Sequence, residues 1–355
     1  MKKFNIAVIP GDGIGKEVMP EAIKILELIK TKFNLSFEHK EFDWGCHHYD
    51  KKDYWMPPNW KEQLADYDVI FFGATGWPEI VPDHQSLWDS LIKFRREFDQ
   101  YINMRPVKFI PGINCPLKNI QDGDIDYIVV RENTEGEYSS IGGRIFENSD
   151  REIVIQESIF SKKGVDRVID FAFNIAKTRK RKKITSATKS NGISITMPYW
   201  DERFKEISKT YPDISTDQFH IDGLTIKLVL EPKLFDVIVA SNLFGDIISD
   251  LGPATAGTIG IAPSANLNPE KKFPSLFEPV HGSAPDIYGK NIANPIGQIW
   301  SAAMMFDFLG HREIYDLILK SITTSILEGP KTPDMGGKAK TKDVGDSIFE
   351  IIKNS

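Results

Sequence analysis

The segment Phe235–Pro253, FDVIVASNLFGDIISDLGP, constrains the fold of this chain more than any other stretch. Its apolar first part predicts a buried strand that ends at Ala240, and the Ser-Asn pair that follows predicts the N-cap of a helix. That helix carries Asp246 and Asp250 at positions i and i+4, which places both carboxylates on one face. A buried strand that leads directly into a helix is the building unit of α/β folds.

The two aspartates of this helix predict a metal site. Two like charges four residues apart on a helix repel each other unless a cation lies between them. A solvated helix face is the alternative interpretation, but the neighbouring Leu243, Phe244 and Leu251 form an apolar setting. Because carboxylate oxygens are hard ligands, Mg²⁺ or Mn²⁺ is expected there, and a thiol-loving metal is not.

Length and charge limit the class of protein. A chain of 355 residues is too long for one small core, so two lobes are expected. The formal net charge of −6 argues against general nucleic-acid binding. The one basic run, Lys177–Lys183, follows an amphipathic helix and precedes a strand, which favours a solvated helix end over a nucleic-acid patch.

Cysteine content and hydropathy predict a cytoplasmic protein. Only two cysteines occur, Cys46 and Cys115, which argues against a disulfide framework and a cysteine-based zinc site. The N-terminal apolar run, Ile6–Pro10, is too short for a signal peptide. The sequence has no run of about 18 apolar residues, so no transmembrane helix is expected.

The N-terminal segment combines a strand, a glycine-rich turn and a helix. Phe4–Pro10 predicts a buried strand, and apolar residues recur at helical spacing from Ile14 to Ile29. The turn between them reads Gly-x-Gly-x-Gly, whereas the dinucleotide-binding fingerprint requires Gly-x-Gly-x-x-Gly. We therefore interpret Gly11–Gly15 as a tight turn near a site.

Three arginines stand at or near the ends of predicted elements. Arg95 and Arg105 lie in and after a helix within Leu87–Pro106, and Arg131 follows the strand Asp126–Val130. Guanidinium groups bind carboxylates through two parallel hydrogen bonds. Each arginine alone is more often a surface ion-pair partner, but the three together favour an acidic small molecule as ligand.

Strands and helices alternate along the chain. Val69–Gly76 and Ile184–Ala187 predict further buried strands, whereas Pro263–Lys290 is interpreted as loop-rich. The alternation predicts an α/β fold with a largely parallel sheet flanked by helices.

The motifs taken together resemble a known family, the β-decarboxylating dehydrogenases, which include isocitrate and 3-isopropylmalate dehydrogenases. The resemblance rests on IPGDGIG, Arg95 and Arg105 before a proline, VVREN with Tyr138, Lys189-Ser190-Asn191, Asp222, NLFGDIISDLG and EPVHGSAPDIYGKNIANP. These motifs cover nearly the whole chain. The resemblance implies the two-lobed fold of that family, which differs from the ordinary Rossmann fold.

The resemblance also implies a division into lobes. Residues 1–100 together with 257–355 would form the cofactor-side lobe. Residues 101–256 would form the lobe for substrate, metal and dimerisation, with an arm around 142–161. The active site would lie in the cleft between the two lobes.

Substrate and metal ligands follow from the same resemblance. Substrate binding is expected from four residues: Arg95, Arg105, Arg131 and Leu91. Asp246 and Asp250 would ligate Mg²⁺ or Mn²⁺, and Asp222 would be supplied by the other subunit of a homodimer. A monovalent cation such as K⁺ is a further candidate.

Two residues would carry the proton transfers. Lys189, also from the other subunit, would act as the base on the C2 hydroxyl of the substrate. Tyr138 would protonate the enolate at C3 after CO₂ has left. A general acid or base of this kind contributes about 10²–10⁴-fold to a rate.

The resemblance implies NAD as the cofactor. His281-Gly282-Ser283-Ala284 resembles the adenosine-binding loop, and Asp286 stands where NAD-using members place an acid. A carboxylate accepts hydrogen bonds from ribose hydroxyls but repels the 2′-phosphate of NADP. The remaining expected cofactor contacts are Asn191, Glu278 and Asn294.

The predicted substrate is D-malate. Isocitrate enzymes carry Ser and Asn where this chain has Asp89 and Leu91, so the match to isocitrate is poor. The motifs SLWDSLIKFRREFDQYINMRP, TKSNGI, SNLFGD and NPIGQIW resemble the D-malate and tartrate dehydrogenase branch most. The expected reaction is oxidative decarboxylation of D-malate to pyruvate and CO₂, with tartrate as a further substrate.

Two alternatives stay open at this stage. The first is 3-isopropylmalate dehydrogenase of leucine synthesis, because Leu91 and Ile92 allow an apolar pocket floor, although Gly192 removes part of the isopropyl-contacting wall. The second is a non-catalytic regulatory subunit of a hetero-oligomer. The intact set of catalytic and metal-ligating residues argues against it.

Overall fold

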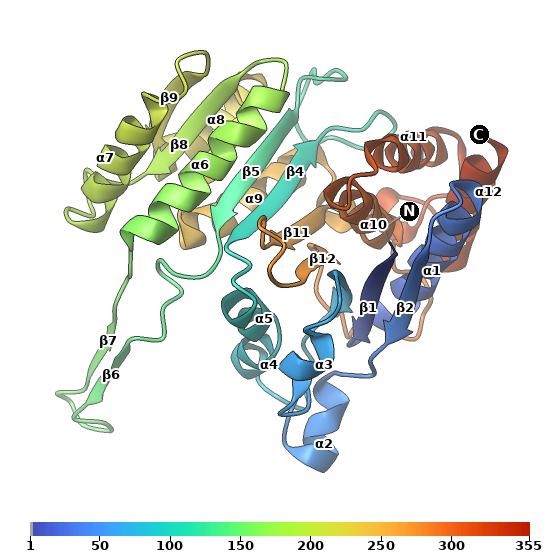
Figure 1. The fold of residues 1–355 in the computed structure, drawn as a ribbon, viewed down its shortest axis with the longest axis horizontal. Coiled ribbons are helices and arrows are strands. Elements are labelled where there is room, and N and C mark those ends of the chain that lie inside the picture. Colours follow the sequence, from blue (N-terminus) through green and yellow to red (C-terminus); the bar gives the residue numbers. More distant parts are fainter. Residues whose placement is uncertain (1–2) are drawn as a thin grey trace.

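One mixed β-sheet of ten strands runs through the whole molecule (Figure 1). The computed structural model describes residues 3–355. In chain order, the strands of this sheet are β1 (Phe4–Gly11), β2 (Phe37–Glu41), β3 (Val69–Ala74), β4 (Ile102–Lys108), β5 (Asp126–Glu132), β8 (Lys183–Thr188), β9 (Ser215–His220), β10 (Val237–Ala240), β11 (Pro263–Leu267) and β12 (Ser275–Pro279). Their order in space is β2-β1-β3-β12-β11-β4-β5-β10-β8-β9.

The sheet consists of two parallel groups joined by antiparallel strands. Strands β2, β1, β3 and β12 are parallel neighbours, as are β5, β10, β8 and β9. Between the groups, β11 pairs antiparallel with both β12 and β4, and β4 pairs antiparallel with β5. The prediction of a largely parallel sheet is confirmed, whereas the lobe boundaries stay a prediction.

Helices cover both faces of the sheet. The longer ones are α1 (Gly15–Lys32), α6 (Lys162–Thr178), α7 (Thr196–Ser208), α8 (Ile221–Leu230), α9 (Asn242–Ala256), α10 (Ile296–Phe308), α11 (Arg312–Glu328) and α12 (Thr341–Asn354). The shorter ones are η1 (Cys46–His48), α2 (Tyr49–Lys52), α3 (Trp60–Leu64), α4 (Asp83–Asp89), α5 (Leu91–Glu97), η2 (Pro232–Leu234), η3 (Ile259–Ile261) and η4 (Pro333–Met335). Helices α6 and α9 lie on opposite faces of the second parallel group (Figure 1).

The predicted helical periodicity describes the core of α1 correctly. Every apolar residue of the predicted stripe is buried: Ile14, Val18, Ala22, Ile25, Leu26 and Ile29. Lys177–Lys183 also behaves as predicted, because Lys177, Lys180, Arg181 and Lys182 are exposed at the end of α6. Within residues 3–355, no helix is long and apolar enough to cross a membrane.

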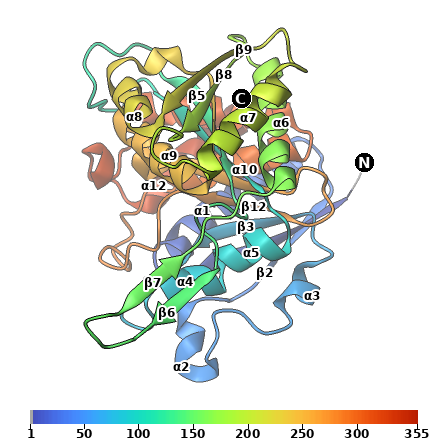
Figure 2. The same cartoon turned by 90° about the vertical axis from the view of Figure 1, so that its left-hand side faces the viewer.

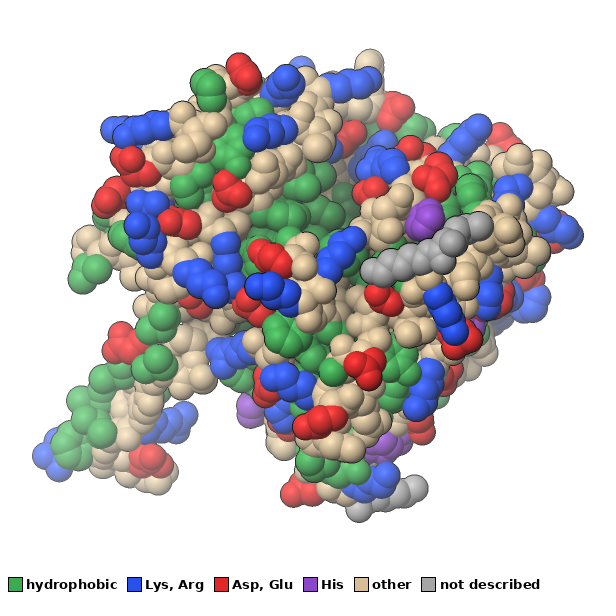
Figure 3. Space-filling model, in the orientation of Figure 1, with side chains coloured by type: hydrophobic (Ala, Val, Ile, Leu, Met, Phe, Trp, Pro, Cys, Tyr) green, Lys and Arg blue, Asp and Glu red, His purple; other side chains and the backbone are tan. Residues whose placement is uncertain are grey.

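A two-stranded arm extends away from the rest of the fold. It consists of β6 (Gly142–Ile145) and β7 (Ile153–Gln156), paired antiparallel, and projects from the body in Figures 1 and 2. All eight of these residues are exposed, and hydrophobic side chains line the arm in Figure 3. This hairpin lies within the segment 142–161, and an exposed apolar ribbon of this kind is typical of an interaction surface. The role of the segment as an arm of the dimerisation lobe stays a prediction.

Two local predictions are wrong. Pro263–Lys290 contains β11 and β12, which are fully buried, instead of being mainly loop. The helical stretch before Pro106 is two helices, α4 and α5, which break at Ser90 because its backbone leaves helical geometry (φ −124°, ψ −95°). The buried Ser90 hydroxyl donates to the Ser86 carbonyl and stabilises this break.

Candidate active site

A cavity of about 270 Å³ lies beside the antiparallel strands that join the two parallel groups. It is lined by residues from both sides: Ala74, Thr75, Leu87, Leu91, Arg95, Arg105, Arg131, Tyr138, Asp246, Asp250, Glu278, Pro279, Val280, His281 and Gly282. All four predicted substrate-binding residues and both helical aspartates are therefore in one place. A larger cavity of about 500 Å³ near Phe4 and Phe308 holds none of the predicted residues.

Arg131 is the buried anchor of the site. The end of β5 places it beneath α9, where Gly245 has no side chain to obstruct it. Its Nη1 donates to Asp246 Oδ1 at 2.5 Å, and its Nη2 donates to Asn242 Oδ1 at 2.7 Å. Burial lowers the pKa of Arg131 and the Asp246 carboxylate opposes that shift, so the guanidinium remains a cation.

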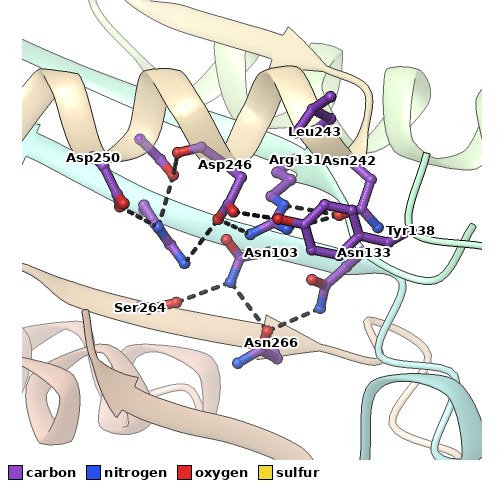
Figure 4. A network of polar contacts seen from close by, with 12 residues as sticks. Asn103, Arg131, Asn133, Tyr138, Asn242, Leu243, Asp246, Asp250, Ser264 and Asn266 are labelled. Carbon is purple, nitrogen blue, oxygen red and sulfur yellow. Dashed lines mark hydrogen bonds and ion pairs between the residues drawn. The ribbon is translucent and has the colours of Figure 1, made fainter. Parts of the chain in front are cut away.

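Arg105 connects the two helical aspartates. Its Nη1 donates to Asp250 Oδ1 at 2.9 Å and to Ser249 Oγ at 2.8 Å, while its Nη2 lies 3.8 Å from Asp246 Oδ1. Figure 4 shows Asp246 and Asp250 pointing from the same side of α9 toward this cluster. The prediction that both carboxylates share one helical face is therefore confirmed.

Tyr138 donates its hydroxyl proton to Asp246 Oδ2 at 2.6 Å. Burial raises the pKa of Tyr138, and the hydrogen bond to Asp246 raises it further, so the phenol keeps its proton. Burial also raises the pKa of Asp246, but the nearby Arg131 and Arg105 guanidiniums outweigh burial and hold it below its ordinary value. The cavity therefore holds a protonated phenol beside an ionised carboxylate.

Arg95 is positioned by a chain of buried amides. Its Nη2 lies 3.6 Å from Glu278 Oε1, and that same oxygen accepts from Asn266 Nδ2 at 2.7 Å. Asn266 Oδ1 accepts hydrogen bonds from the side-chain amides of Asn103 and Asn133 (Figure 4). The Nδ2 of Asn266 is therefore the atom that faces Glu278. The strands β4, β11 and β12 thereby hold this arginine against the cavity.

The start of α9 is capped differently from the prediction. Ser241 is the N-cap residue, but its hydroxyl does not bond to the helix and instead donates to Glu137 Oε1 at 2.8 Å. The other oxygen of Glu137 accepts from the Leu243 backbone N–H at 3.0 Å. A carboxylate distant in sequence therefore caps the helix and also suits the positive end of its dipole.

Lys189 and Asp222 form a pair of their own outside the cavity. Lys189 Nζ lies 2.9 Å from Asp222 Oδ2, and this contact lowers the pKa of the Asp222 carboxyl. Neither residue lines the cavity. Within the described part of one chain, Asp222 does not form a three-residue cluster with Asp246 and Asp250.

The predicted nucleotide loop lies against the glycine-rich turn. The Ile14 N–H donates to the Ser283 carbonyl at 2.8 Å, and Gly13 adopts a positive φ of 51° where an added Cβ would collide with that carbonyl. His281 and Gly282 reach the cavity, whereas Asp286 is exposed. The interpretation of Gly11–Gly15 as a tight turn near a site agrees with this geometry.

The other predicted cofactor residues lie in different settings. Asn294 is buried, with its Nδ2 donating to Asp334 Oδ2 at 3.0 Å. Ala284 has a positive φ of 42° in the same loop, and Asn191 is exposed after β8. The cofactor roles of these residues stay predictions.

Sequence reasoning missed several residues that hold the site together. Asn242 accepts a hydrogen bond from Arg131, and Ser249 accepts one from Arg105. Asn242 lies four residues before Asp246 and Ser249 three residues after it, so helical spacing could have placed both on the face of Asp246. Leu87 adds an apolar wall to the cavity. Glu137 and Asn266 had no recognisable signal in the sequence, because their partners are distant in the chain.

The comparisons with known proteins agree with this geometry. Residues 5–348 match the family described as isocitrate/isopropylmalate dehydrogenase. The chain belongs to this family. Enzymes of the family use NAD(P) and a divalent metal.

Two relatives are similar over almost their full length. D-malate dehydrogenase [decarboxylating] of Escherichia coli (strain K12) is 59% identical over 358 residues, which cover 99% of each chain. Tartrate dehydrogenase/decarboxylase of Pseudomonas putida is 59% identical over 356 residues, which cover 98% of each chain. The predicted class, a decarboxylating dehydrogenase, is confirmed.

Solved structures confirm the predicted fold. Isocitrate dehydrogenase from Methylococcus capsulatus aligns with a TM-score of 0.88 at 31% identity over 99% of both chains. The TT0538 protein from Thermus thermophilus aligns with a TM-score of 0.86 at 32% identity. That alignment covers 99% of this chain and 68% of the other.

Proposed function

We propose that this protein catalyses the NAD-dependent, divalent-metal-dependent oxidative decarboxylation of D-malate to pyruvate and CO₂, and that it also accepts tartrate. The observation that carries the proposal is the small cavity in which three arginines, an aspartate pair and a protonated tyrosine meet. The 59% identity to D-malate and tartrate dehydrogenases supports the choice of substrate.

The residues present fit a hard divalent ion. Asp246 and Asp250 direct carboxylate oxygens into the cavity, and Arg105 and Arg131 now neutralise them. Oxygen ligands suit Mg²⁺ and Mn²⁺ better than softer metals. When bound, the ion would supply Lewis acidity toward the C2 oxygen of the substrate.

The guanidinium groups fit the two carboxylates of a short diacid. Arg95 and Arg105 each leave a buried Nε without a hydrogen-bond partner in the described protein, so donor capacity remains for a ligand. Leu87 and Leu91 give the cavity an apolar wall beside its charged residues. A four-carbon diacid can use several guanidinium donors, and a cavity of about 270 Å³ suits a molecule of this size.

The loop after β12 fits a nicotinamide dinucleotide. His281 has a buried Nε2 without a partner in the described protein, and Gly282 faces open space where a Cβ would meet no atom. Asp286 is exposed and able to accept hydrogen bonds from ribose hydroxyls. When bound, NAD would accept the hydride from C2 of the substrate.

Completion of the site requires a second copy of the chain. Lys189 and Asp222 do not line the cavity of their own chain, so we propose that each reaches the cavity of a partner in a homodimer. Exposed apolar residues on α8 and α9 support such an interface: Ile226, Val229, Leu230 and Ile247. The exposed apolar arm supplies a second surface for it.

The proposed proton transfers use two residues. Lys189 of the partner subunit would take the proton of the C2 hydroxyl while hydride leaves C2. After the C3–C4 bond breaks and CO₂ departs, Tyr138 would deliver its phenolic proton to C3. The raised pKa of Tyr138 keeps that proton available at neutral pH.

A substrate panel tests the proposal. NADH formation would be followed by absorbance with D-malate, L-malate, tartrate, isocitrate and 3-isopropylmalate, in the presence of NAD and Mn²⁺. D-malate is expected to give the highest kcat/KM, followed by tartrate. Equal rates with D-malate and L-malate would contradict the proposed geometry.

3-Isopropylmalate dehydrogenase activity is the second candidate function. Leu87 and Leu91 form an apolar wall that could contact an isopropyl group. A kcat/KM for 3-isopropylmalate far above that for D-malate would replace the substrate assignment and leave the site roles unchanged. The Leu91→Ser variant distinguishes the two candidate functions. It should lower activity on 3-isopropylmalate and spare activity on D-malate, because only the isopropyl group needs an apolar contact at this position.

A further inference from the structure

A second cluster of metal-ligating side chains lies away from the candidate active site. Asp43, His47 and His48 each offer one ligand atom, and these atoms all lie within 4.8 Å of one another. In the described chain, no other group of three His, Cys, Asp or Glu side chains meets that condition. The cluster lies just before α2, at the lower end of the molecule in Figure 1.

The local chain geometry brings these side chains together. η1 turns tightly after Gly45, and the His48 N–H donates to the Gly45 carbonyl at 3.1 Å. His47 Nε2 lies 3.3 Å from Asp43 Oδ1, and the centroids of the His47 and His48 rings are 4.3 Å apart. Two imidazoles and one carboxylate therefore converge within a six-residue segment.

Three ring nitrogens of this cluster make no hydrogen bond within the described protein. Both nitrogens of His47 and the Nδ1 of His48 are buried atoms that make no hydrogen bond, and His47 Nε2 contacts Asp43 Oδ1 only as an ion pair at 3.3 Å. Buried polar atoms in native proteins are nearly always paired, and an exception can mark an ion. The buried Nδ1 atoms of His47 and His48, which make no hydrogen bond, are an observation independent of the contact between His47 and Asp43.

The segment is also held rigidly. The buried Asp12 carboxylate accepts from the Cys46 N–H at 2.7 Å and from the Gly76 N–H at 3.0 Å. The indole N–H of Trp55 donates to it at 3.2 Å. A site whose supporting backbone is fixed loses less entropy when it binds a ligand.

We propose that Asp43, His47 and His48 form a binding site for a divalent first-row transition metal such as Zn²⁺ or Ni²⁺. Imidazole nitrogens suit these metals, whereas Mg²⁺ and Mn²⁺ favour oxygen ligands. In a tetrahedral site with ligands about 2.1 Å from the metal, ligand atoms are separated by about 3.4 Å. The 3.3 Å between His47 Nε2 and Asp43 Oδ1 already matches this separation.

The proposed site has room for a fourth ligand. Asp43 is exposed, so water can complete the coordination shell. Lys16 Nζ lies 4.0 Å from Asp43 Oδ1, beyond hydrogen-bond distance, and its flexible side chain can move aside. None of the three ligands lines the candidate active-site cavity, so the two metal sites are separate.

Titration of the full-length protein with Ni²⁺ by isothermal calorimetry tests the proposal. Excess Mg²⁺ is included to occupy the carboxylate site of Asp246 and Asp250. One Ni²⁺ is expected per chain, with binding at least about tenfold weaker in His47→Ala and His48→Ala. The matched control is His84→Ala, which removes an exposed histidine from α4 and should leave binding unchanged.

Three results would overturn the proposal. They are the absence of saturable Ni²⁺ binding in excess Mg²⁺, unchanged binding in both His47 and His48 variants, and equal loss of binding in His84→Ala. Circular dichroism verifies that each variant is folded, and His47→Gln replaces His47→Ala if the latter unfolds. In a Ni²⁺-soaked crystal, anomalous density between the three side chains supports the site, and density only at Asp246 and Asp250 contradicts it.

Discussion

The proposed active site has two halves: the cavity with its arginines and aspartates, and the Lys189–Asp222 pair. They differ in how completely a single chain neutralises their charges. In the cavity half, Arg131 is 1% exposed and its guanidinium bonds to Asp246 and Asn242. In the other half, Lys189 and Asp222 form an ion pair with each other, and the Asp222 side chain is 67% exposed. An exposed ion pair of this kind contributes little to stability.

In the proposed homodimer, only the Lys189–Asp222 half would depend on assembly. The cavity half is held by strands, a capped helix and buried amides of its own chain, so it exists before any partner binds. The Lys189–Asp222 pair has no such packing, and in the proposed homodimer it would gain its function when a second chain brings a cavity to it. Changes in the two halves should therefore have different effects on stability and on activity.

Lys189→Met should give the largest loss of activity with the smallest structural effect. Removal of a general base costs about 10²–10⁴-fold in kcat, and the exposed ion pair contributes little to the fold. NADH formation and a thermal melt measure both effects. The matched control is Lys183→Met, which breaks a similar pair with Asp217 at the other end of β8. If the Lys183 variant loses as much activity, the assignment of Lys189 as a base is wrong.

Tyr138→Phe should slow overall turnover by about 10²-fold, because no phenol remains to protonate C3. Reduction of an added 2-oxo acid by NADH should be affected much less, since that step needs no proton at C3. Tyr127→Phe is the control, because its buried hydroxyl has no partner in the described structure. Equal losses in both reactions would assign Tyr138 to substrate binding instead.

Asp246→Asn and Asp250→Asn should separate metal binding from stability. Both should raise the Mn²⁺ concentration needed for half-maximal activity by at least about tenfold, because each replaces a charged carboxylate ligand with a neutral amide. Only Asp246→Asn should also destabilise the fold, by about 3 kcal/mol, since it leaves the buried Arg131 without its counterion. Mn²⁺ titrations and urea unfolding measure the two effects, and equal destabilisation by both variants would contradict the assigned difference.

Asp286→Lys should have the smallest effect, a several-fold shift of kcat/KM from NAD toward NADP. A lysine attracts the 2′-phosphate that a carboxylate repels. Asp316→Lys, an exposed change of the same charge on α11, should leave the cofactor ratio unchanged. Unchanged NAD efficiency in Asp286→Lys would exclude a role of this carboxylate at the ribose.

The sequence predicted those parts of the site that depend on local spacing. The i, i+4 spacing correctly predicted that the two aspartates share one helical face, and the three arginines all line the cavity. Arg105 reaches it from within β4 and Arg95 from within α5, not from the ends of neighbouring strands. The resemblance of the longer motifs to a known family then predicted the class of enzyme, and the comparisons confirmed that class.

The parts that escaped prediction depend on contacts between distant segments. Strands β11 and β12 contain proline, serine and asparagine in place of strand-forming residues, and their pairing with β4 and β3 stabilises them. Ser241 looked like a helix cap, but Glu137 reaches that position from another part of the chain. No local pattern could reveal that Asn266 orients Glu278.

Complementation between two inactive variants tests the shared active site most directly. A Lys189→Met chain and an Asp246→Asn chain would be mixed in equal amounts under conditions that exchange subunits. Each mixed dimer would contain one intact site, so activity should rise from near zero to about a quarter of the wild-type value. No recovery of activity, with mixed dimers verified by mass spectrometry, would contradict the assignment of Lys189 to the partner's cavity.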